Sequence, residues 1–149
     1  MKRPEILQQY KKDEENLINI LHALQNNNPQ NYLEEEDLKA ASNHLNITYA
    51  HVYGVVTYYT MFSLKPRGKY IIRFCNSPVC DMEKSSDIIE NIKNVLLINV
   101  GEITKDKRFS LELSECLGQC DIAPSMMINE EVYGNLHNAD LESIFEKYK

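Results

Sequence analysis

The sequence predicts an α-helical first half followed by a small α/β second half. Up to about residue 63, apolar side chains recur with the period of a helix. Beyond the turn that holds Pro66 and Gly68, they form short runs typical of strands. A chain of 149 residues can bury a core in each of two small domains. We therefore expect one domain over residues 1–67 and a second over residues 68–149.

The first half carries the pattern of three helices. Apolar residues over 4–26, most clearly from Leu17 onward, follow the i, i+3, i+4, i+7 spacing of one helical face, and the NNNPQ stretch ends this pattern. A second helix is expected to begin at Asn31 or at the acidic cluster Glu34–Asp37, and a third after Thr48, a favourable N-cap. We interpret the acidic cluster as the first turn of a helix rather than as a metal site.

The third helix, TYAHVYGVVTYYTMF, is apolar on most of its sides. A helix of this kind is buried, either in its own core or against a partner. Gly54 within it indicates a close backbone approach. We therefore predict that the N-terminal half is an interface and that the chain is an obligate subunit of a larger assembly.

The second half has the order strand, helix, strand, followed by a strand, a hairpin and a helix. KYIIRFC predicts a buried strand, residues 82–95 a helix, LLINVG over 96–101 a second strand, and RFSLELSEC over 108–116 a third. SMMINEEVYGNL predicts a hairpin, and NADLESIFEKY a closing helix. This order gives a small α/β domain with helices packed on the sheet.

Four cysteines, the only ones in the chain, form two close pairs: Cys75 and Cys80 in CNSPVC, and Cys116 and Cys120 in CLGQC. Each pair follows a predicted strand, so both loops are expected to meet at one edge of the sheet. Sets of four thiolates hold zinc or an iron–sulfur cluster. The C-x4-C spacing occurs in ferredoxins, whereas most zinc sites use C-x2-C. Spacing alone leaves a [2Fe–2S] cluster, zinc, and disulfides or unliganded thiols open.

Targeting signals and charge narrow the class of protein. The basic opening is followed by no apolar region of a secretory signal, and no run of eighteen apolar residues predicts a membrane span. We expect a cytoplasmic protein, whose cysteines stay reduced. The net charge of −6 argues against nucleic acid or an anionic membrane as partner. Residues 70–149 contain fourteen acidic and eight basic residues. This excess of negative charge disfavours an added electron on a cluster, and it also favours solubility.

YGVVTYYTMF, the C-x4-C loop, a gap of 35 residues and ECLGQCDIAPSMMIN ahead of YGNL together resemble one known family. This is the thioredoxin-like [2Fe–2S] ferredoxin subunit of NADH dehydrogenases, the NuoE-like subunit of respiratory complex I. The similarity runs over nearly the whole chain. The family also supplies the small subunit of NAD-linked and electron-bifurcating hydrogenases and of NAD-dependent formate dehydrogenases. One departure is DMEKSS after the second cysteine, where family members often have a small residue and Gly.

The resemblance implies an α+β protein, with an N-terminal helical bundle followed by a thioredoxin-like [2Fe–2S] domain. It implies that Cys75, Cys80, Cys116 and Cys120 ligate one cluster. It also implies that the helical bundle docks on a flavoprotein subunit that carries FMN and NAD(H). The chain would be soluble or part of the peripheral arm of a membrane complex, without inserting into the membrane itself.

The expected function is electron transfer rather than catalysis on a substrate. The sequence has no GxGxxG, GxxxxGK or GxSxG motif, so nucleotide binding and nucleophilic chemistry are not expected of this chain alone. Gly118 is expected to bend the CLGQC loop so that backbone N–H groups face sulfur. A zinc-stapled adaptor is the main alternative, and a thiol–disulfide oxidoreductase would need a C-x-x-C pair that is not present.

Overall fold

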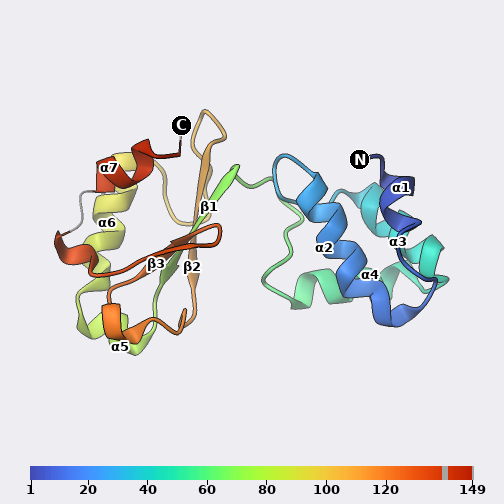
Figure 1. Cartoon of the computed structure of the whole chain (residues 1–149), viewed down its shortest axis with the longest axis horizontal. Coiled ribbons are helices and arrows are strands. Elements are labelled where there is room, and N and C mark those ends of the chain that lie inside the picture. The colour runs from blue at the N-terminus through green and yellow to red at the C-terminus, as the bar shows by residue number, and fades with distance from the viewer. Residues whose placement is uncertain (139–140, 149) are drawn as a thin grey trace. The chain divides into compact units, whose positions relative to one another are not determined.

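The computed structural model describes residues 1–138 and 141–148 and divides the chain into two compact units, Met1–Arg67 and Gly68–Lys149 (Figure 1). We call them the helical unit and, after the family that the sequence resembles, the ferredoxin unit. Among the described residues, no helix is both long and apolar enough to cross a membrane. The helical unit consists of α1 (Arg3–Leu7), a 3-10 turn (Glu14–Asn16), α2 (Leu17–Asn27), α3 (Glu35–Leu45) and α4 (Tyr49–Tyr58).

Two short helices, α1 and α2, occupy the segment predicted as one helix over 4–26. The helical spacing predicted from Leu17 onward is confirmed, because α2 begins at that residue. The chain leaves the helical conformation after Leu7. It restarts where the Asp13 side chain accepts a hydrogen bond from the backbone N–H of Glu15 at 3.2 Å. Buried side chains from all four helices form one core, to which α3 contributes Leu38, Ala41 and Leu45.

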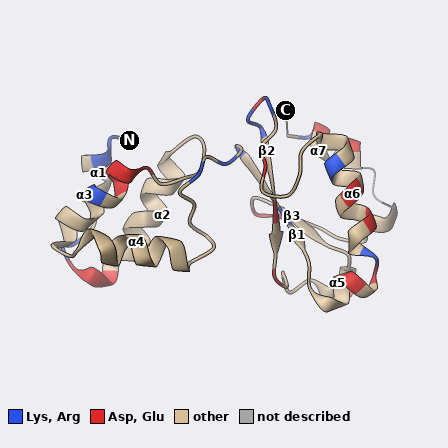
Figure 2. Cartoon of the chain, turned by 180° about the vertical axis from the view of Figure 1, so that it is seen from behind, with Lys and Arg blue, Asp and Glu red and all other residues tan. Residues whose placement is uncertain are grey.

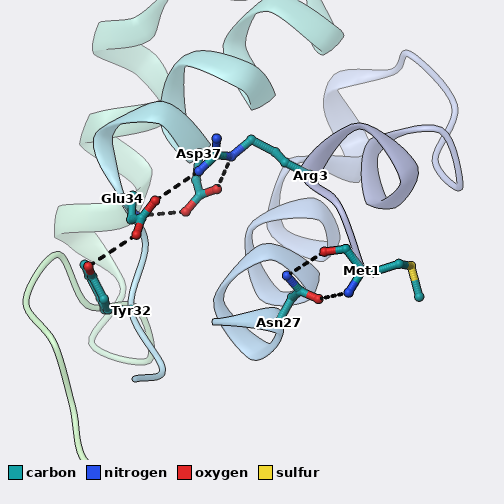
Figure 3. Close-up of polar contacts among 6 residues, drawn as sticks. All are labelled: Met1, Arg3, Asn27, Tyr32, Glu34 and Asp37. Atoms are coloured by element: carbon teal, nitrogen blue, oxygen red, sulfur yellow. Dashed lines mark hydrogen bonds and ion pairs between the residues drawn. The ribbon is translucent and has the colours of Figure 1, made fainter. Parts of the chain in front are cut away.

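Arg3 ties α1 to the N-terminus of α3 (Figure 3). Its Nε donates to Oδ1 of Asp37 at 2.5 Å, and its Nη2 donates to Oε2 of Glu34 at 3.1 Å. Asp37 also accepts a hydrogen bond from the backbone N–H of Glu34 at 2.8 Å, which closes a capping box. The acidic cluster is therefore the first turn of a helix, as predicted.

Replacing Arg3 with Met is expected to lower the stability of the helical unit by about 1–3 kcal/mol, because it removes the cationic partner of a nearly buried carboxylate. The Asp37 side chain is 8 % exposed. Native-state hydrogen exchange of the α1, α2 and α3 amides measures this unit by itself. The exposed lysine in Lys11→Met is the matched control, expected to change stability by less than about 0.5 kcal/mol. Equal effects of the two substitutions would contradict this role of Arg3.

The fourth helix begins as predicted after Thr48, whose hydroxyl accepts a hydrogen bond from the backbone N–H of His51 at 3.3 Å. It buries Val52 and Val56 in the core of the helical unit. Its other faces are not buried in this chain. Four tyrosines on and just after the helix are more than a third exposed: Tyr49, Tyr53, Tyr58 and Tyr59.

The close backbone approach predicted at Gly54 is wrong for the chain as described. Among the described residues, no atom outside its own helix turn and neighbours lies within 4 Å of where a Cβ at Gly54 would stand. The close approach occurs instead at Gly68, where a Cβ would lie 2.4 Å from the backbone carbonyl carbon of Phe109. Gly68 therefore allows the chain that enters the first strand to lie directly against the backbone of Phe109 and Ser110.

The ferredoxin unit contains a four-stranded mixed sheet with strand order β2-β1-β3-β4. The strands β1 and β2 are parallel, and β3 is antiparallel to both β1 and β4. Figures 1 and 2 show α6 and α7 side by side on the same side of the sheet. The elements are β1 (Tyr70–Cys75), α5 (Pro78–Met82), α6 (Ser85–Leu96), β2 (Phe109–Ser114), β3 (Met126–Ile128), β4 (Glu131–Tyr133) and α7 (Leu141–Glu146).

One predicted element of this unit is wrong, the strand over 96–101. Helix α6 continues to Leu96, and Leu97 takes the left-handed conformation (φ 55°) that ends it. The following segment is irregular and attaches to β2 through single hydrogen bonds, such as that from the N–H of Gly101 to the carbonyl of Leu111 at 2.7 Å. The other predicted strands and the hairpin are present. The closing helix is present as α7, although residues 139, 140 and 149 lie outside the described part of the chain.

Candidate metal centre

The two cysteine loops leave the sheet at neighbouring carboxyl ends. Cys75 is the last residue of β1, and its register partner on the parallel strand β2 is Ser114, two residues before Cys116. Parallel strands place their carboxyl ends at the same edge of a sheet. The loops meet there, since the backbone of Leu117 in the second loop hydrogen-bonds the thiol of Cys75 in the first.

The first pair is buried. Cys75 and Cys80 are each 1 % exposed. Pro78 occupies the first turn of α5, where its fixed φ favours helix, and the turn places Cys80 in contact with Cys75. Two hydroxyls accompany the pair: Ser77 Oγ lies 3.2 Å from the Cys75 sulfur, and Ser125 Oγ lies 3.9 Å from the Cys80 sulfur.

The second pair, Cys116 and Cys120, is exposed, and its sulfurs lie 3.5 Å apart. Two thiolates on one tetrahedral ion, with metal–sulfur bonds of about 2.3 Å, are about 3.8 Å apart. The pair is therefore spaced to share one metal ion. Gly118 has a φ of 77°, and its N–H donates to the Cys116 sulfur at 3.4 Å, as predicted for this glycine.

Local electrostatics favour the thiolate form of the buried Cys75. Burial alone raises the pKa of its thiol. Hydrogen bonds from the Ser77 hydroxyl, from the backbone N–H groups of Leu117 and Ser77, and from Cys80 outweigh this effect and lower the pKa from 9.0 to about 7. The hydrogen bond and negative charge of Cys116 raise the pKa of the Cys120 thiol. A thiolate is the form that binds a metal.

The four sulfurs fit a two-metal cluster in number, chemistry and arrangement. Within the described part of the chain, no three His, Cys, Asp or Glu side chains surround one point as a single metal ion requires. The sulfurs are instead arranged as two pairs, one at the end of β1 and one after β2. A [2Fe–2S] cluster takes two protein ligands on each of its two irons. The residues present fit that cofactor.

The DMEKSS stretch, which departs from the pattern of the resembled family, runs from the end of α5 to the start of α6 and contains a residue in the left-handed conformation. Lys84 has φ 56° and ψ 41°, a conformation that costs a side-chain-bearing residue about 1–2 kcal/mol and glycine nothing. It separates α5 from α6, and α6 (Ser85–Leu96) is the helix predicted over 82–95.

Replacing Lys84 with Gly is expected to stabilise the ferredoxin unit by up to about 1 kcal/mol, because the relieved strain exceeds the entropy that glycine adds to the unfolded chain. The matched control is Ser86→Gly in the exposed first turn of α6, where the same residue type should cost about 0.5 kcal/mol. Chemical denaturation of both variants measures the difference. A loss of stability in Lys84→Gly would contradict this interpretation of the turn.

Paired cysteines at the carboxyl ends of two parallel strands, in a small sheet covered by helices, define the class of a ferredoxin, a carrier of electrons on an iron–sulfur cluster. The comparison with known families identifies which ferredoxins these are. Residues 4–149 match the family described as thioredoxin-like [2Fe-2S] ferredoxin, and the chain belongs to this family. Its cofactor is therefore a [2Fe–2S] cluster.

Three curated relatives show the range of enzymes in which such chains occur. The chain is 35% identical to NADP-reducing hydrogenase subunit HndA of Solidesulfovibrio fructosivorans over 135 residues, which are 91% of this chain and 78% of the relative. It is 38% identical to the NADH-quinone oxidoreductase subunit designated E in Rickettsia typhi over 117 residues, 78% of this chain and 69% of the relative. For the subunit of the same designation in Aquifex aeolicus, the identity is 33% over 147 residues, 99% and 91% of the two chains.

A solved structure supports the fold. In the crystal structure of an NAD+-reducing [NiFe]-hydrogenase in the air-oxidized state, one chain superposes with a TM-score of 0.77 at 22% identity. The superposition covers 89% of the present chain and 22% of the hydrogenase chain. The likeness at this identity concerns the fold alone.

Sequence reasoning missed the two serines beside the buried pair. Ser77 precedes Pro78 at the start of α5, a position where a serine hydroxyl usually caps backbone N–H groups. Ser125 lies five residues after the last cysteine, and no spacing rule connects it with Cys80. Position in the folded loops, rather than any motif, brings both hydroxyls to sulfur.

Proposed function

We propose that the chain is the electron-transfer subunit of a multi-subunit NADH-linked oxidoreductase. Cys75, Cys80, Cys116 and Cys120 ligate one [2Fe–2S] cluster, which exchanges single electrons with the FMN of a partner flavoprotein. The observation that carries the proposal is the convergence of the two cysteine pairs at one sheet edge. The family membership and the relatives, which are named as hydrogenase and NADH-quinone oxidoreductase subunits, support it.

The two cysteine pairs have different roles, because one pair is buried and the other is exposed. The cluster supplies the one-electron chemistry when bound. The buried residues Cys75 and Cys80 hold one side of it away from water, which reduces solvent screening of charge there. The exposed residues Cys116 and Cys120 bring the opposite side to the surface of the ferredoxin unit. A redox partner could approach a bound cluster from this exposed side, at Cys116 and Cys120.

The helical unit supplies the docking surface for the flavoprotein subunit. The outward faces of α4 and the residue after it present four exposed tyrosines, and aromatic residues are enriched in protein interfaces. Tyr49 and Tyr53 stack at 6.2 Å and line an open groove together with Leu64 and the acidic residues Glu34 and Glu35. The groove fits an apolar segment of the partner with a basic residue at its edge.

Replacing Tyr53 and Tyr58 together with Ala is expected to weaken the complex with the flavoprotein subunit by tenfold or more, since buried tyrosines often contribute on the order of 1–2 kcal/mol each. The stability of the isolated chain should change by less than about 1 kcal/mol, because both side chains are exposed, at 45% and 79%. Leu97→Ala, which truncates an 87% exposed side chain of the ferredoxin unit, is the control. Unchanged partner binding in the double variant would contradict this docking surface.

The function is tested by purifying the tagged chain, with its bound partners, from the organism that encodes it. The expected complex contains FMN, and NADH reduces the cluster, seen as an EPR signal. The isolated chain should be reduced by dithionite but not by NADH. A chain that co-purifies without any flavoprotein, and whose cluster NADH does not reduce in the extract, would overturn the proposal. The other subunits identify the complex as a complex I arm, a hydrogenase or a formate dehydrogenase.

A further inference from the structure

Two buried serine hydroxyls contact the two buried sulfurs of the site. Ser77 is 6 % exposed, and its Oγ lies 3.2 Å from the sulfur of Cys75. Ser125 is 1 % exposed, and its Oγ lies 3.9 Å from the sulfur of Cys80. A thiolate has no proton to donate, so a metal-bound sulfur accepts the hydrogen bond and the serine donates it.

The backbone around Ser77 places its hydroxyl at sulfur and away from the usual role of such a residue. Ser77 is the N-cap of α5, where serine side chains normally accept a hydrogen bond from a backbone N–H. The Ser77 side chain makes no such capping bond, although its backbone carbonyl accepts the N–H of Asp81 at 2.9 Å. The hydroxyl bonds the Cys75 sulfur instead.

Ser125 is fixed from the opposite side of the site. Its carbonyl oxygen accepts the backbone N–H of Cys75 at 3.1 Å, immediately before β3 pairs with β1. This bond holds the serine against the end of β1, with its side chain beside Cys80. A buried hydroxyl without a partner costs about 1–3 kcal/mol, so the bond to sulfur also satisfies Ser125.

We propose that Ser77 and Ser125 are positioning residues that raise the reduction potential of the cluster by donating hydrogen bonds to its two buried thiolates. The inference rests on the proposed ligation by Cys75 and Cys80. Reduction adds one negative charge to the cluster and its ligands, and a hydrogen bond to a ligand sulfur stabilises the more negative state. The bonds lie in a buried region, where water screens them little.

These hydroxyls oppose the effect of the surrounding acidic residues. Figure 2 shows acidic residues, coloured red, on α5 and α6 of this unit. They disfavour an added electron, although solvent screens exposed charges. The Ser77 hydroxyl lies 3.2 Å and the Ser125 hydroxyl 3.9 Å from the sulfur of a cysteine that is 1 % exposed. We expect the hydroxyls to be the stronger local influence, so that their removal makes the cluster harder to reduce.

The test is an EPR-monitored redox titration of the full chain, reconstituted anaerobically with iron and sulfide, as wild type, Ser77→Ala, Ser125→Ala and the double variant. Each alanine variant should lower the equilibrium constant for reduction by about tenfold, of the order expected for one hydrogen bond to a charged group, and the double variant by about the product. Ser77→Thr keeps the hydroxyl and should restore the wild-type value. Ser86→Ala, which changes an exposed serine of α6, is the control.

Resonance Raman spectroscopy keeps the proposal testable if an alanine variant loses its cluster. In the wild type, bands for stretching of the iron–cysteine bonds should shift in deuterated solvent, because exchangeable hydroxyl protons bond the sulfurs, and the threonine variant should retain this shift. Variants that hold two irons and two sulfides at an unchanged potential would overturn the inference and leave the ligation intact. A wild-type chain that never takes up iron and sulfide would instead overturn the proposed function.

Discussion

Replacing Cys80 with Ala is expected to remove the cluster altogether, lowering bound iron from about two atoms per chain to near zero. Cys80 is 1 % exposed beside the Cys75 thiol and the Ser125 hydroxyl, and the chain has no fifth cysteine to supply the missing thiolate. Because binding of the metal contributes to folding, the ferredoxin unit should also lose stability. Iron and sulfide content after anaerobic reconstitution, with thermal unfolding of the same samples, measures both effects.

The neighbouring substitution Val79→Ala is the matched control for Cys80→Ala. Val79 stands beside Cys80 on α5 but is 42% exposed, so its truncation should leave the iron content unchanged. Alanine at Cys75, Cys116 or Cys120 is expected to have the same effect on iron as Cys80→Ala, although the last two are exposed. Any one of the four variants that keeps two irons and the wild-type spectrum would show that its cysteine is not a ligand.

Replacing Phe109 with Ala is expected to destabilise the ferredoxin unit by about 3–5 kcal/mol. Phe109 is 0% exposed, and its ring packs on Tyr70 at 5.7 Å and on Phe145 at 5.5 Å. It therefore joins the first residues of β1 and β2 to α7. A loss of this size is a large fraction of the 5–15 kcal/mol that usually stabilises a whole domain. Denaturant unfolding of the reconstituted protein measures it.

The control for Phe109 lies on the same strand. Leu113→Ala truncates another apolar residue of β2, but Leu113 is 44% exposed, and the expected change is below about 0.5 kcal/mol. The helical unit, probed by hydrogen exchange in α2 and α3, should not respond to either substitution. Similar losses at Phe109 and Leu113 would contradict the described core.

The alternation of β2 shows where sequence patterns stop being informative. Phe109, Leu111 and Leu113 are spaced to share one face, and the first two are buried. Leu113 is exposed and lies next to the last residue of the strand, three residues before Cys116. A period of two specifies which residues share a side of the sheet, but the extent of the covering layer depends on the tertiary structure.

Two residues of positive φ form turns that the sequence pattern does not indicate. The strand expected at 96–101 has a strand-like composition, yet Leu97 ends α6 in the left-handed region and turns the chain. Lys84 takes the same left-handed conformation between α5 and α6 and turns the chain there. Both positions hold residues that rarely adopt this conformation, so sequence propensity gives no warning of either turn. The surrounding contacts determine these conformations.

The site was more predictable than these turns, because cysteine spacing and the preceding strands carry positional information. The pattern of Cys75, Cys80, Cys116 and Cys120 after two apolar strands predicted their meeting at one edge, and β1 and β2 are parallel in that register. The different burial of the two pairs was not predictable. It depends on which loop is covered by α5 and by the residues before β3, and these contacts are long-range.

The central claim, a [2Fe–2S] cluster on four thiolates, is tested most directly on the anaerobically purified protein. Absorption and EPR spectra are recorded before and after reduction with dithionite, and iron, sulfide and zinc are counted per chain. We expect about two irons, two sulfides and a rhombic EPR signal that develops on reduction, as for a [2Fe–2S] cluster on four cysteines. A colourless, EPR-silent protein with one zinc ion per chain would contradict the account and support a zinc-stapled adaptor.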